Sequence, residues 1–147
     1  MTTAITRFAL ALCLGLFALA GHSASKETHI QLPDNLGTAV MYTPRRGSLE
    51  TAIIVVHEWW GLNEYARSRA RQLADEGYAA IAVDMYGHGK VAKHPKDATA
   101  FMNAALAEPE IMSARFNAAK AELLALKNVQ QVFAIGYCFG GAVVLNQ

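Results

Sequence analysis

Apolar residues along this chain form short continuous runs that alternate with stretches of helical period. Three of these runs each predict a buried strand: residues 53–56, 79–83 and 132–135. Between the first two runs, Ala66, Ala70 and Leu73 recur at helical spacing, and Gly77 follows as a stop signal. The pattern therefore predicts a helix over residues 64–76 that joins the first two strands.

Two more helices are expected before the third strand. The first begins near Pro95, and Pro109 separates it from the second. The second has one apolar face: Met112, Phe116, Ala119, Leu123 and Leu126. We interpret this face as packing against the sheet. A lipid-binding face is disfavoured because the neighbouring charges are few and mixed in sign: Arg115, Lys120 and Glu122.

The third strand leads into a glycine-rich turn with a cysteine at its centre. Residues 136–141 read Gly-Tyr-Cys-Phe-Gly-Gly, and helix-compatible residues follow. This is the pattern of a nucleophile elbow, in which a strained strand-to-helix turn pushes the central side chain, here Cys138, out over the sheet. The start of the helix favours a thiolate and a developing oxyanion. The alternative is a small turn around a buried, inert cysteine.

The second strand ends in a polar turn, residues 84–89, at a position where open α/β sheets bind ligands. Asp84 is a candidate catalytic acid there, but an aspartate at the end of a strand more commonly caps the turn. His57 is interpreted as a turn-forming side chain, and His88 and His94 as solvated surface residues. We therefore assign no catalytic acid or base within this chain.

Three segments of the chain resemble the dienelactone hydrolases (carboxymethylenebutenolidases) of the α/β-hydrolase superfamily. The first is His-Glu-Trp-Trp-Gly-Leu-Asn at residues 57–63. The second combines Gly-Tyr at residues 77–78 with Val-Asp-Met-Tyr-Gly at residues 83–87, and the third is the elbow at residues 136–141. The resemblance extends from about residue 36 to residue 147. It implies an α/β-hydrolase fold, with a mostly parallel sheet and flanking helices, and hydrolysis of small lactones or esters.

The resemblance also implies roles for individual residues. Cys138 would be the nucleophile of a Cys-His-Asp triad, and Glu58 would contact the resting thiol and help to generate the thiolate. The backbone amides of Trp59 and Phe139 would form the oxyanion hole. No cofactor or metal ion is expected.

The substrates that the family resemblance implies are small and usually anionic, so a cationic group near the turn is expected. Better-known members carry an arginine shortly after the tyrosine of the turn, whereas this chain has Gly-His-Gly-Lys at residues 87–90. His88 and Lys90 are weak candidates for contact with an anion. The departure leaves the natural substrate open.

The order of the triad has a further implication. In α/β-hydrolases the acid and the histidine follow the nucleophile along the chain, yet only six residues follow Gly141. We expect the triad Asp and His to lie outside this chain, which is then the N-terminal part of one hydrolase domain. Because such domains need roughly 200 residues, we expect the chain alone to be inactive and unstable. An inactive truncated remnant is an alternative.

The first 24 residues have the pattern of a secretory signal peptide. Arg7 precedes an apolar core of thirteen residues, and small and polar residues follow. The core is too short for a membrane span, which needs about 20 apolar residues. We expect cleavage near residue 24, export to the periplasm or medium, and no stable membrane association of residues 25–147, which form a single domain.

Removal of the leader changes the charge and the thiol content. The chain has 13 Lys and Arg against 12 Asp and Glu, and of these only Arg7 lies in the leader. The remainder therefore has no net charge with His neutral, and we expect it not to bind nucleic acid. Cys138 becomes the only thiol, which excludes an intramolecular disulfide. A thiol-based redox or binding module is therefore a second alternative, although the chain lacks a C-x-x-C pair. The oligomeric state is left open.

Overall fold

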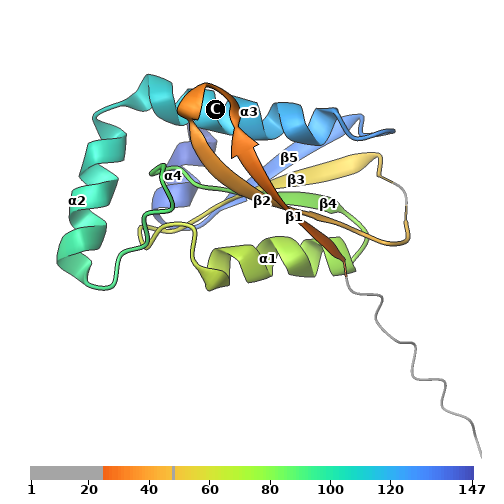
Figure 1. Ribbon diagram of the computed structural model, residues 1–147, viewed down its shortest axis with the longest axis horizontal. Coiled ribbons are helices and arrows are strands. Elements are labelled where there is room, and N and C mark those ends of the chain that lie inside the picture. The colour runs from red at the N-terminus through yellow and green to blue at the C-terminus, as the bar shows by residue number, and fades with distance from the viewer. Residues whose placement is uncertain (1–24, 48) are drawn as a thin grey trace, which may run out of the picture.

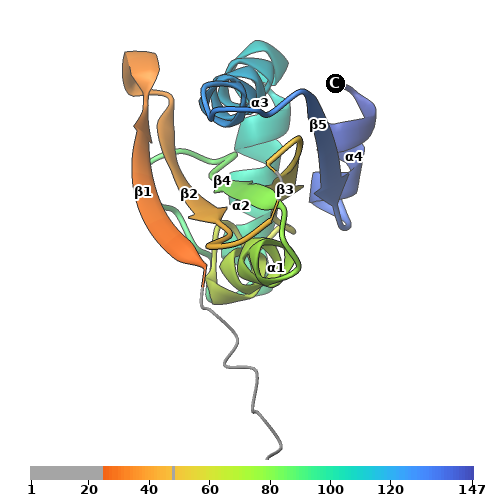
Figure 2. The same ribbon diagram turned by 90° about the vertical axis from the view of Figure 1, so that its right-hand side faces the viewer.

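The computed structural model describes residues 25–47 and 49–147, so the predicted leader lies outside the described residues. Five strands form one sheet in the order β1-β2-β4-β3-β5. Helix α1 covers one face of this sheet, and α3 and α4 lie on the opposite face (Figures 1 and 2). The architecture is the α/β class that was predicted.

The three predicted strands lie side by side and run in the same direction. They are β3 (Thr51–Val56), β4 (Ala79–Val83) and β5 (Gln131–Gly136). β3 and β4 are largely buried as predicted, whereas β5 has no buried residue because it lies at the edge of the sheet. β3 lies between the other two and pairs in parallel with both, so that Val56 is opposite Val83 on one side and Gly136 on the other. The carboxyl ends of the three strands therefore meet at one edge of the sheet, which is where open α/β sheets bind ligands.

Two antiparallel strands that were not predicted complete the sheet. β1 (Lys26–Leu32) and β2 (Gly37–Thr43) form a hairpin around a short 3₁₀ turn, and β2 pairs antiparallel with β4. The sheet is therefore mixed. β1 is an edge strand with mostly exposed side chains, so it lacks the continuous apolar run that predicts β3, β4 and β5.

Helix α1 (Glu64–Asp75) closely follows the expected boundaries. Asn63 caps its N-terminus, because the side-chain oxygen accepts a hydrogen bond from the Ala66 amide at 3.1 Å. Ala66, Ala70 and Ala74 are buried against the sheet. Gly77 follows the helix with φ of 103°, a conformation that glycine adopts without steric cost.

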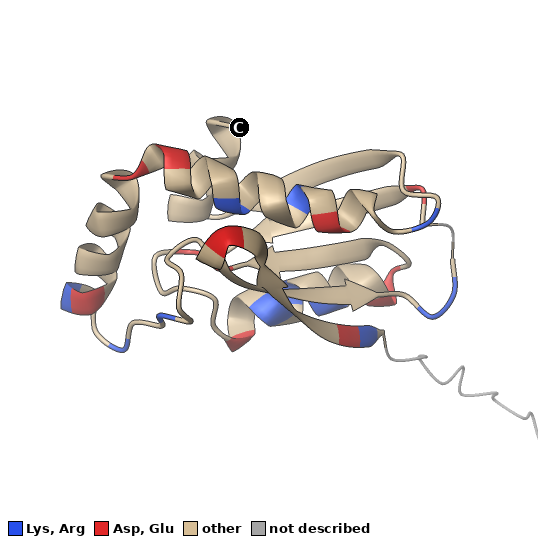
Figure 3. Ribbon diagram, turned by 45° about the horizontal axis from the view of Figure 1, so that its top comes forward, with Lys and Arg blue, Asp and Glu red and all other residues tan. Residues whose placement is uncertain are grey.

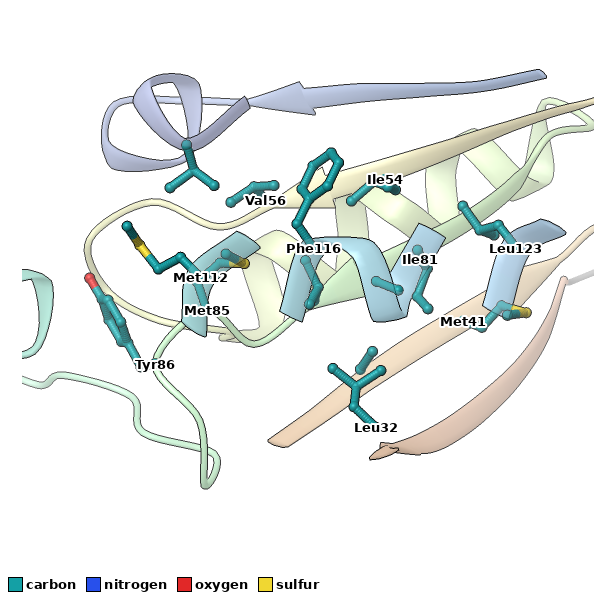
Figure 4. Packing of buried hydrophobic residues seen from close by; sticks show 14 of the residues in the cluster. Leu32, Met41, Ile54, Val56, Ile81, Met85, Tyr86, Met112, Phe116 and Leu123 are labelled. Atoms are coloured by element: carbon teal, nitrogen blue, oxygen red, sulfur yellow. The ribbon is translucent and has the colours of Figure 1, made fainter. Parts of the chain in front are cut away.

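The remaining helices are α2 (Pro95–Leu106), α3 (Pro109–Leu124) and α4 (Phe139–Leu145). The predicted apolar face of α3 packs on the sheet, where Phe116 and Leu123 meet Ile54 and Ile81 in the main core (Figure 4). Each fully buried side chain of this size contributes about 1.5–3 kcal/mol relative to exposure. Leu126 lies beyond the end of α3 and is only partly buried.

Charged residues are distributed over the outer surfaces of the helices and loops. In the view of Figure 3, basic and acidic residues are interspersed along α1 and α3. Arg115 differs from the other charged residues on α3 because it is only 9% exposed. Within the described part of the chain, no helix is both long and apolar enough to cross a membrane.

Candidate active site

The connection between β5 and α4 is a sharp turn with Cys138 at its tip. Cys138 has φ of 54° and ψ of −119°, a combination that is sparsely populated for any residue with a side chain. Its side chain is exposed and forms no disulfide. The backbone thus presents the thiol outward at the start of a helix, which is the geometry expected for a nucleophile elbow.

Two glycines allow the chain to make this turn. A Cβ atom on Gly136 would lie 2.3 Å from the carbonyl carbon and oxygen of Gly140, and one on Gly140 would lie 2.5 Å from the carbonyl oxygen of Val56. These neighbours are backbone atoms that cannot move aside. The start of α4 can therefore approach β5 and the end of β3 only because neither position has a side chain.

The loop after β3 lies beside the elbow. Val56 and Gly136 are register partners in adjacent parallel strands, so Glu58 and Cys138 each lie two residues beyond the same edge. Glu58 and Trp59 are partly buried and Phe139 is buried. Among the described residues, no hydrogen bond joins the Glu58 carboxylate to the Cys138 thiol, and neither the Trp59 nor the Phe139 amide donates one.

His57 is buried beneath this loop, with 1% of its surface exposed. Its Nδ1 lies 2.5 Å from the carbonyl oxygen of Glu58, and its Nε2 lies 3.1 Å from the backbone nitrogen of Met85. Because a carbonyl only accepts and an amide only donates, the ring is neutral and carries its proton on Nδ1. Burial lowers the pKa of His57 below its ordinary value. Both nitrogens are occupied, so His57 is unavailable as a catalytic base.

Asp84 caps the turn that follows β4, as predicted. Its carboxylate accepts hydrogen bonds from the amides of Tyr86, Gly87 and Gly89 at 2.9, 3.0 and 2.8 Å. Asp84 is fully buried, and these three bonds explain its position without a catalytic role.

The predicted candidates for anion contact lie at the end of the same turn. His88 and Lys90 are exposed, and His88 has φ of 59°. The Lys90 ammonium nitrogen lies 5.8 Å from the centre of the Phe101 ring. His94 is also exposed, at the N-terminus of α2. The described residues contain no cluster of three or more His, Cys, Asp or Glu side chains that could hold a metal ion.

Sequence reasoning missed the contribution of two residues to this region. The Arg115 guanidinium donates to the carbonyl oxygens of Leu36 and Met85, each at 2.7 Å, and so ties α3 to the turn after β4. The Tyr86 hydroxyl donates to the carbonyl oxygen of Trp59 at 2.9 Å. Burial raises the pKa of Tyr86, as do the nearby charges of Cys138 and Asp84. Tyr86 lies in the segment 83–87 that resembles the family, but nothing in the local sequence pattern indicates that its hydroxyl binds the Trp59 carbonyl.

Residues 38–147 match the family model described as "Dienelactone hydrolase family". The chain is 46% identical over 48 residues to a candidate carboxymethylenebutenolidase of Saccharolobus solfataricus, a match that covers 33% of this chain and 18% of that protein. It is 42% identical over 64 residues to "Protein usf" of Aquifex pyrophilus, covering 41% of this chain and 26% of that protein.

Among solved structures, the chain resembles a dienelactone hydrolase-like promiscuous phosphotriesterase, P91, from metagenomic libraries. The TM-score is 0.73 at 30% identity, and the match covers 83% of this chain and 53% of that one. The chain thus spans about half the length of this structural relative. Since the family model matches most of the chain, and the elbow and its flanking loops lie within that match, the protein belongs to the dienelactone hydrolase family.

Proposed function

We propose that the protein hydrolyses small esters or lactones and that Cys138 is its nucleophile. The observation that carries this proposal is the conformation of Cys138, with an exposed thiol at φ of 54° between the end of β5 and the start of helix α4. A sparsely populated backbone conformation is retained where the surrounding structure over-determines it, and such positions cluster at active sites.

In the proposed reaction, the Cys138 thiolate attacks the substrate carbonyl and forms a tetrahedral intermediate. The amides of Trp59 and Phe139, which have no partner among the described residues, would donate to its oxyanion. Collapse of the intermediate expels the alcohol and leaves a thioester on Cys138. Water then attacks the thioester, releases the acid and regenerates the thiol.

The proton transfers need groups that the described residues do not supply. Glu58 lies at the same strand edge as Cys138, and we assign it the role of activating the thiol when substrate arrives. Among the described histidines, His57 has both ring nitrogens paired, and the others are exposed: His29, His88 and His94. We therefore infer that the triad Asp and His belong to sequence outside this chain, which spans about half of its structural relatives.

Two further aspects belong to the proposal. His88 and Lys90 are exposed at the turn beside the site and would bind a substrate carboxylate. If Lys90→Ala changes the KM for charged and neutral esters equally, that contact does not exist. Export is proposed from the leader pattern in residues 1–24, and N-terminal sequencing of the mature protein from the expressing cell's exported fraction tests it.

The deciding experiment measures hydrolysis of p-nitrophenyl acetate by the full-length protein and by Cys138→Ala. Turnover should fall to background in Cys138→Ala while the unfolding transition stays close to wild type, because an exposed side chain contributes little packing. Cys138→Ser should also be a poor enzyme, since serine has a much higher pKa than the thiol.

Two outcomes would count against this proposal. Retention of more than about a few per cent of activity in Cys138→Ala would contradict the assignment, because loss of the nucleophile should cost several powers of ten in rate, at about 1.4 kcal/mol each. A wild-type thiol that reacts reversibly with oxidants but hydrolyses nothing would favour the redox alternative.

A further inference from the structure

The two peptide groups on either side of the Trp59 Cα atom are each held by a buried side chain. In the peptide between Glu58 and Trp59, the carbonyl oxygen accepts a hydrogen bond from His57 Nδ1 at 2.5 Å. In the next peptide, the Trp59 carbonyl oxygen accepts one from the Tyr86 hydroxyl at 2.9 Å. The torsion angles of Trp59 are therefore confined between two fixed peptide planes.

The first of these bonds, together with a longer one from the Gly61 amide to the same Glu58 oxygen at 3.2 Å, also sets the direction of the Trp59 amide. In a trans peptide the carbonyl and the N–H point in opposite directions. Because the Glu58 carbonyl is turned toward the buried ring of His57, the Trp59 N–H points away from that ring. The amide donates no hydrogen bond to any other described residue, so it is free to bind an external oxygen.

Both holding side chains are themselves anchored. His57 Nε2 accepts the Met85 amide at 3.1 Å, and the Tyr86 amide donates to Asp84 at 2.9 Å. The Tyr86 ring packs edge-on against His57 at 4.7 Å and lies 5.4 Å from the ring of Phe139. Tyr86 thus contacts both residues whose amides are proposed to hold the oxyanion.

We propose that His57 and Tyr86 are positioning residues that clamp the Trp59 amide in place for oxyanion binding. The proposal rests on the hydrolase function proposed above. Neither side chain needs to touch the substrate, because each acts through the peptide group that it holds. Donors that are oriented before the reaction stabilise the transition state without the cost of reorganisation.

Tyr86→Phe tests the clamp in the full-length protein, because it removes one hydroxyl and keeps the ring. We expect kcat for p-nitrophenyl acetate to fall on the order of 10-fold with little change in KM, since the oxyanion develops only in the transition state. Tyr42→Phe is the matched control. Tyr42 is 1% exposed and lies on β2, which is separated from β5 by β4 and β3. The kcat of Tyr42→Phe should therefore stay within about twofold of wild type.

Alkylation of Cys138 by iodoacetamide separates positioning from general loosening of the site. Displacement at a saturated carbon forms no oxyanion, so the alkylation rate should be the same in wild type and Tyr86→Phe. A parallel loss of alkylation and hydrolysis would overturn the clamp, as would equal losses of kcat in Tyr86→Phe and Tyr42→Phe.

A pair of changes at His57 gives a second test if Tyr86→Phe does not fold. His57→Asn keeps an N–H donor near the Nδ1 position, whereas His57→Leu keeps only bulk. His57→Asn should retain several-fold more kcat than His57→Leu, and equal kcat values would overturn the clamp. If hydrolysis by the wild type does not depend on Cys138, the proposed function fails. If it depends on Cys138 but tolerates the Tyr86 and His57 changes, only the clamp fails.

Discussion

Neighbouring glycines at the elbow differ in how much space surrounds them. A Cβ on Gly140 would meet the carbonyl oxygens of Val56 and His57 at 2.5 and 2.6 Å, whereas one on Gly141 would first meet Gly136 at 3.3 Å. Neither glycine has a positive φ. The contrast between them is therefore one of packing against backbone, because their backbone conformations allow a side chain equally well.

Gly140→Ala should destabilise the full-length protein by about 2–3 kcal/mol or more, because the added methyl group forces α4 away from β3. Gly141→Ala should stay within about 1 kcal/mol of wild type, since the gain in helix propensity offsets a mildly tight contact. Urea unfolding of the two variants measures both. Equal losses of stability would show that the close approach of α4 to β3 does not constrain the elbow.

The buried, neutral ring of His57 makes stability depend on pH. Burial holds the pKa of His57 below its ordinary value of 6.5, so the unfolded chain takes up a proton that the folded chain does not. Its contribution is fully present above pH 6.5 and is lost as the pH falls toward the lowered folded value, with a slope of at most about 1.4 kcal/mol per pH unit.

Urea unfolding between pH 8 and pH 5 should therefore show a decline in the free energy of unfolding below about pH 6.5, which His57→Asn removes in part. The comparison between the two proteins isolates His57 from the other titrating groups. An identical pH profile in both would contradict the assignment of the buried neutral ring.

At the scale of the elements, helix α3 connects two parts of the fold that are distant in sequence. Arg115 reaches from this helix to the carbonyl oxygen of Leu36 before β2 and to that of Met85 after β4. Its Nη2 also occupies the space beside Gly87, where a Cβ would approach it to 2.5 Å. The turn that presents Tyr86 is therefore braced from α3 as well as capped by Asp84.

Arg115→Met should cost about 2–4 kcal/mol, because it leaves two carbonyl oxygens without their donor in a buried setting. Lys120→Met is the control on the same helix, where the side chain is exposed and the change should cost less than about 0.5 kcal/mol. Chemical denaturation of the full-length variants measures the difference. A cost for Arg115→Met no larger than for Lys120→Met would rule out the bracing role.

At the scale of the whole molecule, β5 forms the edge of the sheet and pairs only with β3 among the described strands. Phe133 on this strand is 56% exposed, and Leu145 on α4 is 89% exposed. A hollow of about 340 Å³ opens between α1 and β5, lined in part by Arg69, Leu73 and Tyr137. An apolar edge strand of this kind is a template for association with other strands.

Residues 25–147 expressed alone should consequently be largely insoluble or self-associated and show no hydrolysis above background. Phe133→Lys should increase the soluble monomer fraction, because a charge on an edge strand opposes edge-to-edge pairing. Leu124→Lys adds the same charge at a residue that is 47% exposed on α3 and should have little effect. Size-exclusion chromatography of the three proteins decides. A monomeric wild-type segment would contradict the prediction.

Much of the fold could be predicted because its signals are local. The strands β3, β4 and β5 are continuous apolar runs, although only β3 and β4 are buried in the structure. Helix α1 has its cap, its periodicity and its stop residue within a few positions of one another. The turn role of Asp84 also follows from its own neighbourhood, since all three donors lie within five residues. β1 escaped prediction because an exposed edge strand carries no apolar pattern.

The sequence by itself determined that a cysteine occupies a glycine-flanked turn between a strand and a helix, because that geometry depends on the steric size of adjacent residues. Only the tertiary structure decided which carbonyl oxygens Arg115 binds, which ring nitrogen of His57 carries the proton and which loop the Tyr86 hydroxyl binds. Arg115 and Met85 are 30 positions apart in the sequence, and Tyr86 and Trp59 are 27 positions apart, whereas His57 and Glu58 are adjacent. Even the nearest of them requires a second, distant partner, Met85, to fix the tautomer. Long-range pairings follow from the order of strands in the sheet, and no local pattern specifies that order.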